Sequence, residues 1–375
     1  MLKQISLLLI AMFLFTGCNT FGSKAQVTQE QAKIAQTVSK VCKWMLDNRT
    51  ETAGGKRHDT NWTVGAWYSG VYAAYDLTKN PEFLKPLMAM ETTTQWKVGR
   101  SPLFADDQCI AQTYLDLYMN VKKDPAMIAN TQKVLDSMMA KPVDGDMTHH
   151  MQVCYKGEWS WCDSLYMGPA VWSKLAQATG EQKYLDFMDK KWWKTYDFLF
   201  DKDESLYYRD AAYFNKREAN GAKVFWSRGN GWVMGGLARV IESMPQDYPS
   251  RPRYIELYKE MAARIVSIQQ EDGLWHSSLL DPASYPQKET SGSGFYCYAL
   301  AWGVNNGILD KEQYLPAVDK AWNALLSCVT EEGKLTSVQP IGADPRKFDP
   351  DSTEVYGVGA FLLTGHEMYK LAEIR

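Results

Sequence analysis

A cluster of small, aromatic and polar residues recurs six times along the chain, and it constrains the fold more than any other feature. The clusters centre on residues 67, 107, 163, 231, 292 and 357, so neighbouring centres lie 40 to 68 residues apart. Each interval has room for two helices and their loops. We therefore predict six helical hairpins closed into a double ring, an all-α (α/α)6 barrel. An open solenoid or an irregular helical domain is the alternative, but equivalent residues at every junction favour closure.

The segments between the junctions have a helical pattern. Apolar residues recur at three- and four-residue spacing in segments 34–46, 114–121, 170–178, 232–241, 254–268 and 361–371. Alternating runs are scarce, and only 153–155 and 206–208 are candidate strands. In a closed ring the junctions before the inner helices meet at one end and form one pocket. Free N–H groups of helix N-termini in that pocket would suit an anion.

The first 18 residues have the pattern of an export signal. A basic start at Lys3 is followed by an apolar run from Ile5 to Phe15, which is too short to span a membrane. The run ends in Leu-Phe-Thr-Gly-Cys, which resembles a bacterial lipoprotein box with Cys18 as the lipidated residue. An ordinary secretory signal is the alternative. We divide the chain into the signal (1–18), a tether (19–32) and one (α/α)6 domain (33–375). We expect it in the cell envelope, on the periplasmic or the surface face, touching the membrane only through this lipid.

The composition excludes some partners. Lys and Arg number 41 against 44 Asp and Glu, a net charge of −3, whereas nucleic-acid binders carry a basic surplus. The 14 Trp, 21 Tyr and 13 Phe indicate either a sugar-binding cleft or a large aromatic core. The six cysteines after Cys18 form no CxxC pair, so we expect buried thiols. Cys154 and Cys162 are the one pair that could form a disulfide. No Cys/His cluster indicates a metal site.

Asp163 is the first candidate for chemistry. It lies in the sequence among Trp159, Trp161, Tyr166 and Met167. Desolvation by such neighbours raises the pKa of a carboxyl and keeps it protonated nearer neutrality, as a general acid requires. The alternative is that Asp163 only caps the helix that follows. Capping alone does not require the aromatic surroundings, so we favour catalysis.

Asp106 and Asp107 open another predicted helix in the same way. One of them could cap the helix while the other faces the pocket, and the pattern leaves open which does which. Together with Asp163 they would place two carboxylates in a sugar-sized cleft, the usual equipment for acid–base work on a glycosidic substrate.

Residues 225–232, Phe-Trp-Ser-Arg-Gly-Asn-Gly-Trp, form the third element. Arg228 can bind a carboxylate through two parallel hydrogen bonds, and Trp226 and Trp232 can stack on a sugar ring. We interpret the segment as a clamp for a uronic acid. Arg209 either joins this clamp or pairs with its neighbour Asp210.

Other polar junction residues have weaker signals. We expect His149 and His150 in a solvated loop, and Glu289 and Glu354 at the pocket rim or as helix caps. Trp67, at the first junction, is a further candidate for sugar binding.

These motifs, in this order, resemble glycoside hydrolase family 105, the unsaturated rhamnogalacturonyl hydrolases. Family 88, the unsaturated glucuronyl hydrolases, is similar at a greater distance. The resemblance covers nearly all of residues 33–375 and implies the same (α/α)6 fold. Its most specific parts are Ala105-Asp106-Asp107 with Gln112-Thr113-Tyr114, Trp161-Cys162-Asp163 with Met167, Trp226-Ser227-Arg228 with Gly231-Trp232, Glu289-Thr290-Ser291-Gly292 and Thr353-Glu354-Val355-Tyr356-Gly357.

The resemblance implies a catalytic domain that removes a terminal 4,5-unsaturated uronic acid from oligosaccharides made by a polysaccharide lyase, with pectin-derived rhamnogalacturonan fragments as the expected source. Asp163 would protonate C4 of the vinyl ether and help water add at C5, so no metal or organic cofactor is needed. Asp107 would orient the water or the ring, a role for which Asp106 stays open. The implied pocket residues are Trp161, Met167, Trp226, Arg228 and Trp232, with Arg209 where some relatives have a His.

Two other functions remain at this point. Another (α/α)6 sugar enzyme, such as an epimerase or an inverting glycosidase, would fit the fold, although an epimerase would want pocket histidines and the chain has only five His in total. A surface glycan-binding lipoprotein would explain the aromatic residues and the anchor but not Asp163.

Overall fold

The computed structural model describes residues 27–50, 52, 55 and 57–373. The predicted signal with Cys18, and residues 19–26 of the predicted tether, lie outside these described residues. The first helix, α1 (Gln29–Asp47), begins within the predicted tether, because Thr28 and Gln31 form a reciprocal capping box. The helical domain therefore begins four residues before the predicted boundary at residue 33.

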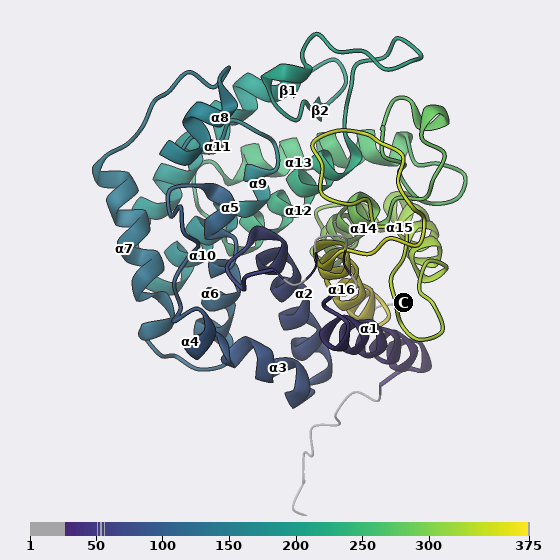
Figure 1. The fold of residues 1–375 in the computed structure, drawn as a ribbon, viewed down its shortest axis with the longest axis horizontal. Helices are drawn as coiled ribbons and strands as arrows, with labels where there is room; N and C mark the ends of the chain where they lie inside the picture. Colours follow the sequence, from purple (N-terminus) through teal and green to yellow (C-terminus); the bar gives the residue numbers. More distant parts are fainter. Residues whose placement is uncertain (1–26, 51, 53–54, 56, 374–375) are drawn as a thin grey trace, which may run out of the picture.

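Inner and outer helices alternate along the chain in two layers (Figure 1). The inner layer consists of α2 (Trp62–Thr78), α6 (Ala111–Asn120), α10 (Pro169–Thr179), α12 (Ser227–Ser243), α14 (Thr290–Asn305) and α16 (Val355–Leu371). The outer layer consists of α1, α3 (Pro81–Met88), α7 (Ala126–Ala140), α11 (Lys183–Leu199), α13 (Arg251–Ser267) and α15 (Lys311–Leu326). Each inner helix packs against the next, and α16 packs against α2. The ring is closed, which confirms the predicted (α/α)6 barrel.

The two layers differ in burial because they meet different surroundings. Inner helix α14 is buried at every position from Thr290 to Val304, as expected for a helix enclosed on all sides. Outer helix α1 instead buries a stripe of apolar residues and exposes the opposite face. The three- and four-residue spacing that predicted the helices is the spacing of such stripes.

Glycine allows the ring to close tightly between α2 and α16. A Cβ atom at Gly70 would lie 2.5 Å from the carbonyl oxygen of Gly359, and one at Gly359 would lie 2.6 Å from the carbonyl oxygen of Ala66. Larger residues at these two positions would push the first and last inner helices apart.

Short elements connect the main helices, and they correct one strand prediction. Residues 153–155 are helical, because α8 (His150–Val153) continues into the 3₁₀ turn η1 (Cys154–Lys156). Gly157, with φ of 103°, ends this turn and donates its N–H to the Cys154 carbonyl. The other candidate is a strand: β2 (Leu206–Tyr207) pairs antiparallel with β1 (Phe200–Asp201). The remaining short elements are α4 (Met90–Thr93), α5 (Ala105–Gln108), α9 (Ser164–Met167), η2 (Ala211–Tyr213) and η3 (Pro282–Ser284).

The six cysteines of the described part are buried free thiols, and Cys154 and Cys162 are therefore not joined. No helix within the described ranges combines the length and the apolar character needed to cross a bilayer.

Candidate active site

The N-terminal ends of the inner helices carry the residues singled out from the sequence. Asp163 directly precedes α9, and its side chain makes no capping hydrogen bond to that helix. Only 13% of the side chain is exposed, and the Cys162 thiol lies 3.5 Å from Oδ2. Burial raises the pKa of Asp163, and the charges of Arg209 and Arg228 oppose that rise. Because the carboxyl does not serve as a cap, it is available for proton transfer.

Arg209 pairs with Asp210, one of the two alternatives considered for it, and it also lies beside Asp163. Its Nε lies 3.7 Å from Oδ2 of Asp163, and its Nη1 lies 2.5 Å from Oδ2 of Asp210. Its carbonyl also accepts a hydrogen bond from the Cys162 N–H at 2.8 Å. The segment after β2 therefore contacts the Asp163 loop twice, through a backbone hydrogen bond to Cys162 and through the guanidinium beside the Asp163 carboxyl.

Asp106 and Asp107 face different surroundings. Asp106 is coupled to Asp163 and Arg209, and burial followed by the Asp163 charge raises its pKa well above the ordinary value. Its Oδ1 is buried and has no hydrogen-bond partner among the described residues. Asp107 instead accepts a hydrogen bond at 2.6 Å from the N–H of Ser101. The structure thus brings Asp106 to Asp163 and directs Asp107 to its own loop.

Arg228 is buried and largely engaged with the backbone. Nη1 donates to the Gln339 carbonyl at 2.7 Å, and Nη2 donates to the Pro340 carbonyl at 3.0 Å. The guanidinium lies over Trp226 and Tyr356, with its Cζ 4.4 Å and 4.9 Å from the two ring centroids. The Nε–H is buried without a partner in the part of the chain that the structure describes. Arg228 therefore fixes the 339–340 segment beside the site and keeps one donor uncommitted.

The aromatic candidates divide between the site and the core. Trp232 is fully buried, with its ring centroid 4.3 Å from that of Phe295 and 4.8 Å from that of Tyr166. Trp67, also fully buried, packs on Tyr68. For these two residues the large aromatic core is the better explanation of the composition.

Other candidates stay at the junctions. Trp161, two residues before Asp163, is 2% exposed, and Met167, at the end of α9, is 1% exposed. Trp226 donates its Nε1–H to Oε1 of Gln339 at 2.9 Å. None of these three side chains is open to solvent, so each supports the site from behind and does not form its exposed surface.

The weaker candidates follow the expectation in part. His149 is exposed, as expected, whereas His150 is partly buried. The Nδ1 of His150 lies 2.9 Å from the Ser160 hydroxyl, and burial, followed by the charge of Arg209, lowers its pKa to about 4. Glu289 caps α14 by accepting hydrogen bonds from Ser291 and Gly292, as expected. Glu354 precedes α16 but caps nothing, and its buried Oε2 has no partner among the described residues.

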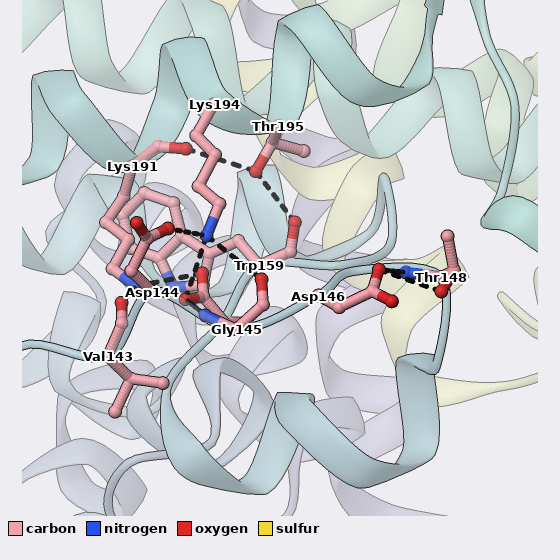
Figure 2. Close-up of polar contacts among 10 residues, drawn as sticks. Val143, Asp144, Gly145, Asp146, Thr148, Trp159, Lys191, Lys194 and Thr195 are labelled. Carbon is pink, nitrogen blue, oxygen red and sulfur yellow. Dashed lines mark hydrogen bonds and ion pairs between the residues drawn. The ribbon is translucent and has the colours of Figure 1, made fainter.

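The loop that carries Asp163 is fixed to outer helix α11. Glu158 lies 2.9 Å from Nζ of Lys191 and 3.0 Å from Nζ of Lys194, and its own side chain is fully buried. Thr195 donates its hydroxyl to the Trp159 carbonyl at 2.7 Å. Figure 2 shows these α11 side chains reaching across to the loop. The position of Asp163 is thus set by the preceding loop, which is anchored to α11, as well as by α9, which follows it.

The buried Asp163, with a second carboxyl and an arginine beside it, is suited to acid–base chemistry on an anionic substrate. The model of Glycosyl Hydrolase Family 88 matches residues 37–372, and the chain belongs to this family. This confirms the resemblance found in the motifs. The protein is a glycoside hydrolase that removes a terminal unsaturated uronic acid from oligosaccharides made by lyases.

Individual relatives agree over most of the chain. An unsaturated 3S-rhamnoglycuronyl hydrolase of Formosa agariphila is 42% identical, over 84% of this chain and 85% of its own length. A protein of the same name from an Alteromonas species is 36% identical, over 82% of this chain and 77% of its own length. Among solved structures, a family 88 glycosyl hydrolase from Bacteroides vulgatus has a TM-score of 0.80 at 30% identity, covering 90% of this chain and 99% of the other.

Proposed function

We propose that the unsaturated uronic acid removed by this enzyme is linked to rhamnose, and that Asp163 is the general acid and base. Two relatives, at 42% and 36% identity, are both named unsaturated 3S-rhamnoglycuronyl hydrolase, which supports a rhamnose next to the uronyl unit. Rhamnogalacturonan fragments and sulfated glucuronorhamnan fragments both contain such a linkage. The observation that supports this role for Asp163 is that its carboxyl is buried, caps no helix and lies next to Arg209.

The chemistry follows from one carboxyl acting twice. Protonated Asp163 delivers its proton to C4, and positive charge develops at C5 beside the ring oxygen. Water adds at C5 and gives its proton to the Asp163 carboxylate, which restores the acid. The hemiketal opens, the ring oxygen becomes a hydroxyl on C1, and the resulting hemiacetal releases the leaving sugar. General acid–base catalysis of this kind contributes about 10²- to 10⁴-fold in rate.

We assign the supporting role to Asp106 instead of Asp107. Asp106 is coupled to Asp163 and has an uncommitted buried oxygen, so it can accept a hydrogen bond from the attacking water or from a ring hydroxyl. Asp107 is engaged with Ser101 and acts by shaping the loop. Arg209 faces Asp163 and can bind the uronate carboxylate while it stabilises the ionised form of the acid.

The test is the loss of ultraviolet absorbance as the conjugated uronate is consumed. Lyase digests of rhamnogalacturonan, of a 3-sulfated glucuronorhamnan and of a glycosaminoglycan are compared with wild type and Asp163→Asn. We expect decay on a rhamnose-linked digest with wild type and a loss of at least about 10²-fold in the variant. Decay only on the glycosaminoglycan digest would overturn the rhamnose assignment. Equal rates for variant and wild type would remove Asp163 from its role.

We also propose that the protein is exported and lipidated at Cys18, on the strength of the signal pattern at 1–18. Expression of wild type and Cys18→Ala in a bacterial host with a labelled fatty acid tests this. We expect label and membrane fractionation for wild type and neither for the variant. Unlabelled wild type would leave the ordinary secretory signal as the explanation.

A further inference from the structure

Three aromatic rings form a continuous stack beside the site. The ring centroids of Trp161 and Phe104 lie 5.1 Å apart at an interplanar angle of 23°. Those of Phe104 and Tyr155 lie 4.5 Å apart at 28°. Both pairs are close to parallel, so Phe104 lies between the other two rings and supports Tyr155 from behind.

The stack connects the catalytic carboxyls to solvent. Trp161 is two residues from Asp163, and Phe104 directly precedes α5, which carries Asp106. Exposure increases outward: Trp161 is 2% exposed, Phe104 is partly buried and Tyr155 is 48% exposed. The pKa of Tyr155 is raised first by burial and then by the charges of Cys154, Asp106 and Asp107. The ring contacts through Phe104 to Trp161 place the outer end of the stack on the side of the site that carries Asp106.

Exposed apolar side chains are concentrated at this place. Of the four large hydrophobic residues exposed in the described part of the chain, Met151 (66%) and Tyr155 (48%) both lie on the α8–η1 segment. The loop does not need these side chains for its position, because Glu158, Lys191 and Thr195 already fix it to α11. Two exposed apolar side chains that share one short segment beside the site are a candidate binding surface for the apolar face of a sugar.

We propose that Tyr155, the exposed outer ring of the stack, forms a platform for the sugar rings of the leaving oligosaccharide, beyond the sugar directly linked to the uronate. The inference rests on the proposed function, since it concerns the leaving side of the same site. The apolar C–H face of a pyranose stacks on an aromatic ring, and a neutral platform accepts it without a charged partner. On this proposal the enzyme prefers longer fragments, because the additional sugar rings extend outward to the exposed end of the stack at Tyr155.

The experiment compares an unsaturated disaccharide with the tetrasaccharide of the same linkages, using wild type, Tyr155→Ala and Tyr155→Phe. We expect Tyr155→Ala to raise KM for the tetrasaccharide by about fivefold to tenfold. Its kcat, and both constants for the disaccharide, should stay as in wild type. Tyr155→Phe keeps the ring and should keep the preference. Tyr118→Ala is the matched control. Tyr118 is a partly buried tyrosine near the C-terminal end of α6, and its removal should leave the ratio of the two KM values unchanged.

Each outcome decides one question. If wild type cleaves neither substrate, the proposed function fails and the platform fails with it. If wild type cleaves both and Tyr155→Ala leaves the KM ratio unchanged, the platform alone is overturned. Equal loss on both substrates with a lower Tm would show that Tyr155 supports the fold, which also overturns the platform. A KM effect confined to the tetrasaccharide supports it.

Discussion

Glu158 accepts a hydrogen bond from Nζ of Lys191 at 2.9 Å, and 0% and 9% of the two side chains are exposed. The pair joins the loop that carries Asp163 to outer helix α11. A buried ion pair is often no more stabilising than an apolar pair of the same volume. Removing one partner is nevertheless costly, because the other charge is then buried without compensation.

We therefore expect Glu158→Ala to lower the free energy of unfolding by about 3–5 kcal/mol. Asp144→Ala removes a fully exposed partner of Lys194 and should change the stability far less, because solvent screens that pair. Urea denaturation of the two variants beside wild type makes the comparison. Similar losses in both would show that burial does not control the strength of this anchor.

Asp106→Asn should reduce kcat and move the basic limb of the kcat/KM profile to lower pH. The charge of Asp163 adds to burial in raising the pKa of Asp106, and by the same repulsion an ionised Asp106 disfavours ionisation of Asp163, an effect that the variant removes. Asp107→Asn is the matched control, because Asp107 contacts Ser101 and not Asp163. A shift in the profile with Asp107→Asn and none with Asp106→Asn would reverse our assignment.

Arg209→Ala should move the same basic limb in the opposite direction, to higher pH. The guanidinium lowers the pKa of Asp163, so its removal lets the acid stay protonated longer as pH rises. KM should also rise if Arg209 binds the uronate. Lys202→Ala removes an exposed positive charge and should leave the profile in place. An unchanged limb in Arg209→Ala would mean that the 3.7 Å contact is electrostatically weak in solution.

His366, on α16, should make stability depend on pH. Burial disfavours its charge, but hydrogen bonds to Asp76 of α2 and to Glu367 outweigh burial and raise its pKa. Its contribution is complete below the unfolded pKa, about 6.5, and is lost as pH rises through the higher folded pKa. Unfolding of wild type and His366→Gln is compared at about pH 6 and about pH 9. We expect the difference to shrink at the higher pH, and a constant difference would contradict the pairing.

The sequence predicts the barrel because the pattern that indicates one helical hairpin occurs six times. Six junctions at similar intervals, each followed by helical periodicity, indicate a closed ring even without any long-range contact. Asp163 could be found for a similar reason, since its aromatic neighbours are adjacent in the sequence and predict desolvation directly.

Other features depend on contacts that no local pattern contains. Asp106 and Asp107 are neighbours on one helical turn, so their side chains point about 100° apart, and only the fold decides which one faces Asp163. Arg228 binds carbonyls more than 100 residues away, at Gln339 and Pro340. Trp232 is a sugar-binding candidate from its motif, yet its ring packs on Phe295 and Tyr166, residues distant in the sequence.

The contact between α16 and α2 has a consequence for synthesis. The final inner helix completes the wall begun by the first, and the glycines at 70 and 359 fit the two together. Five of the six hairpins can leave the ribosome before the pocket has all its sides. We expect a polypeptide terminated before Val355 to contain Asp163, Asp106 and Arg209 and yet to lack a complete site, because the ring of inner helices stays open between α14 and α2.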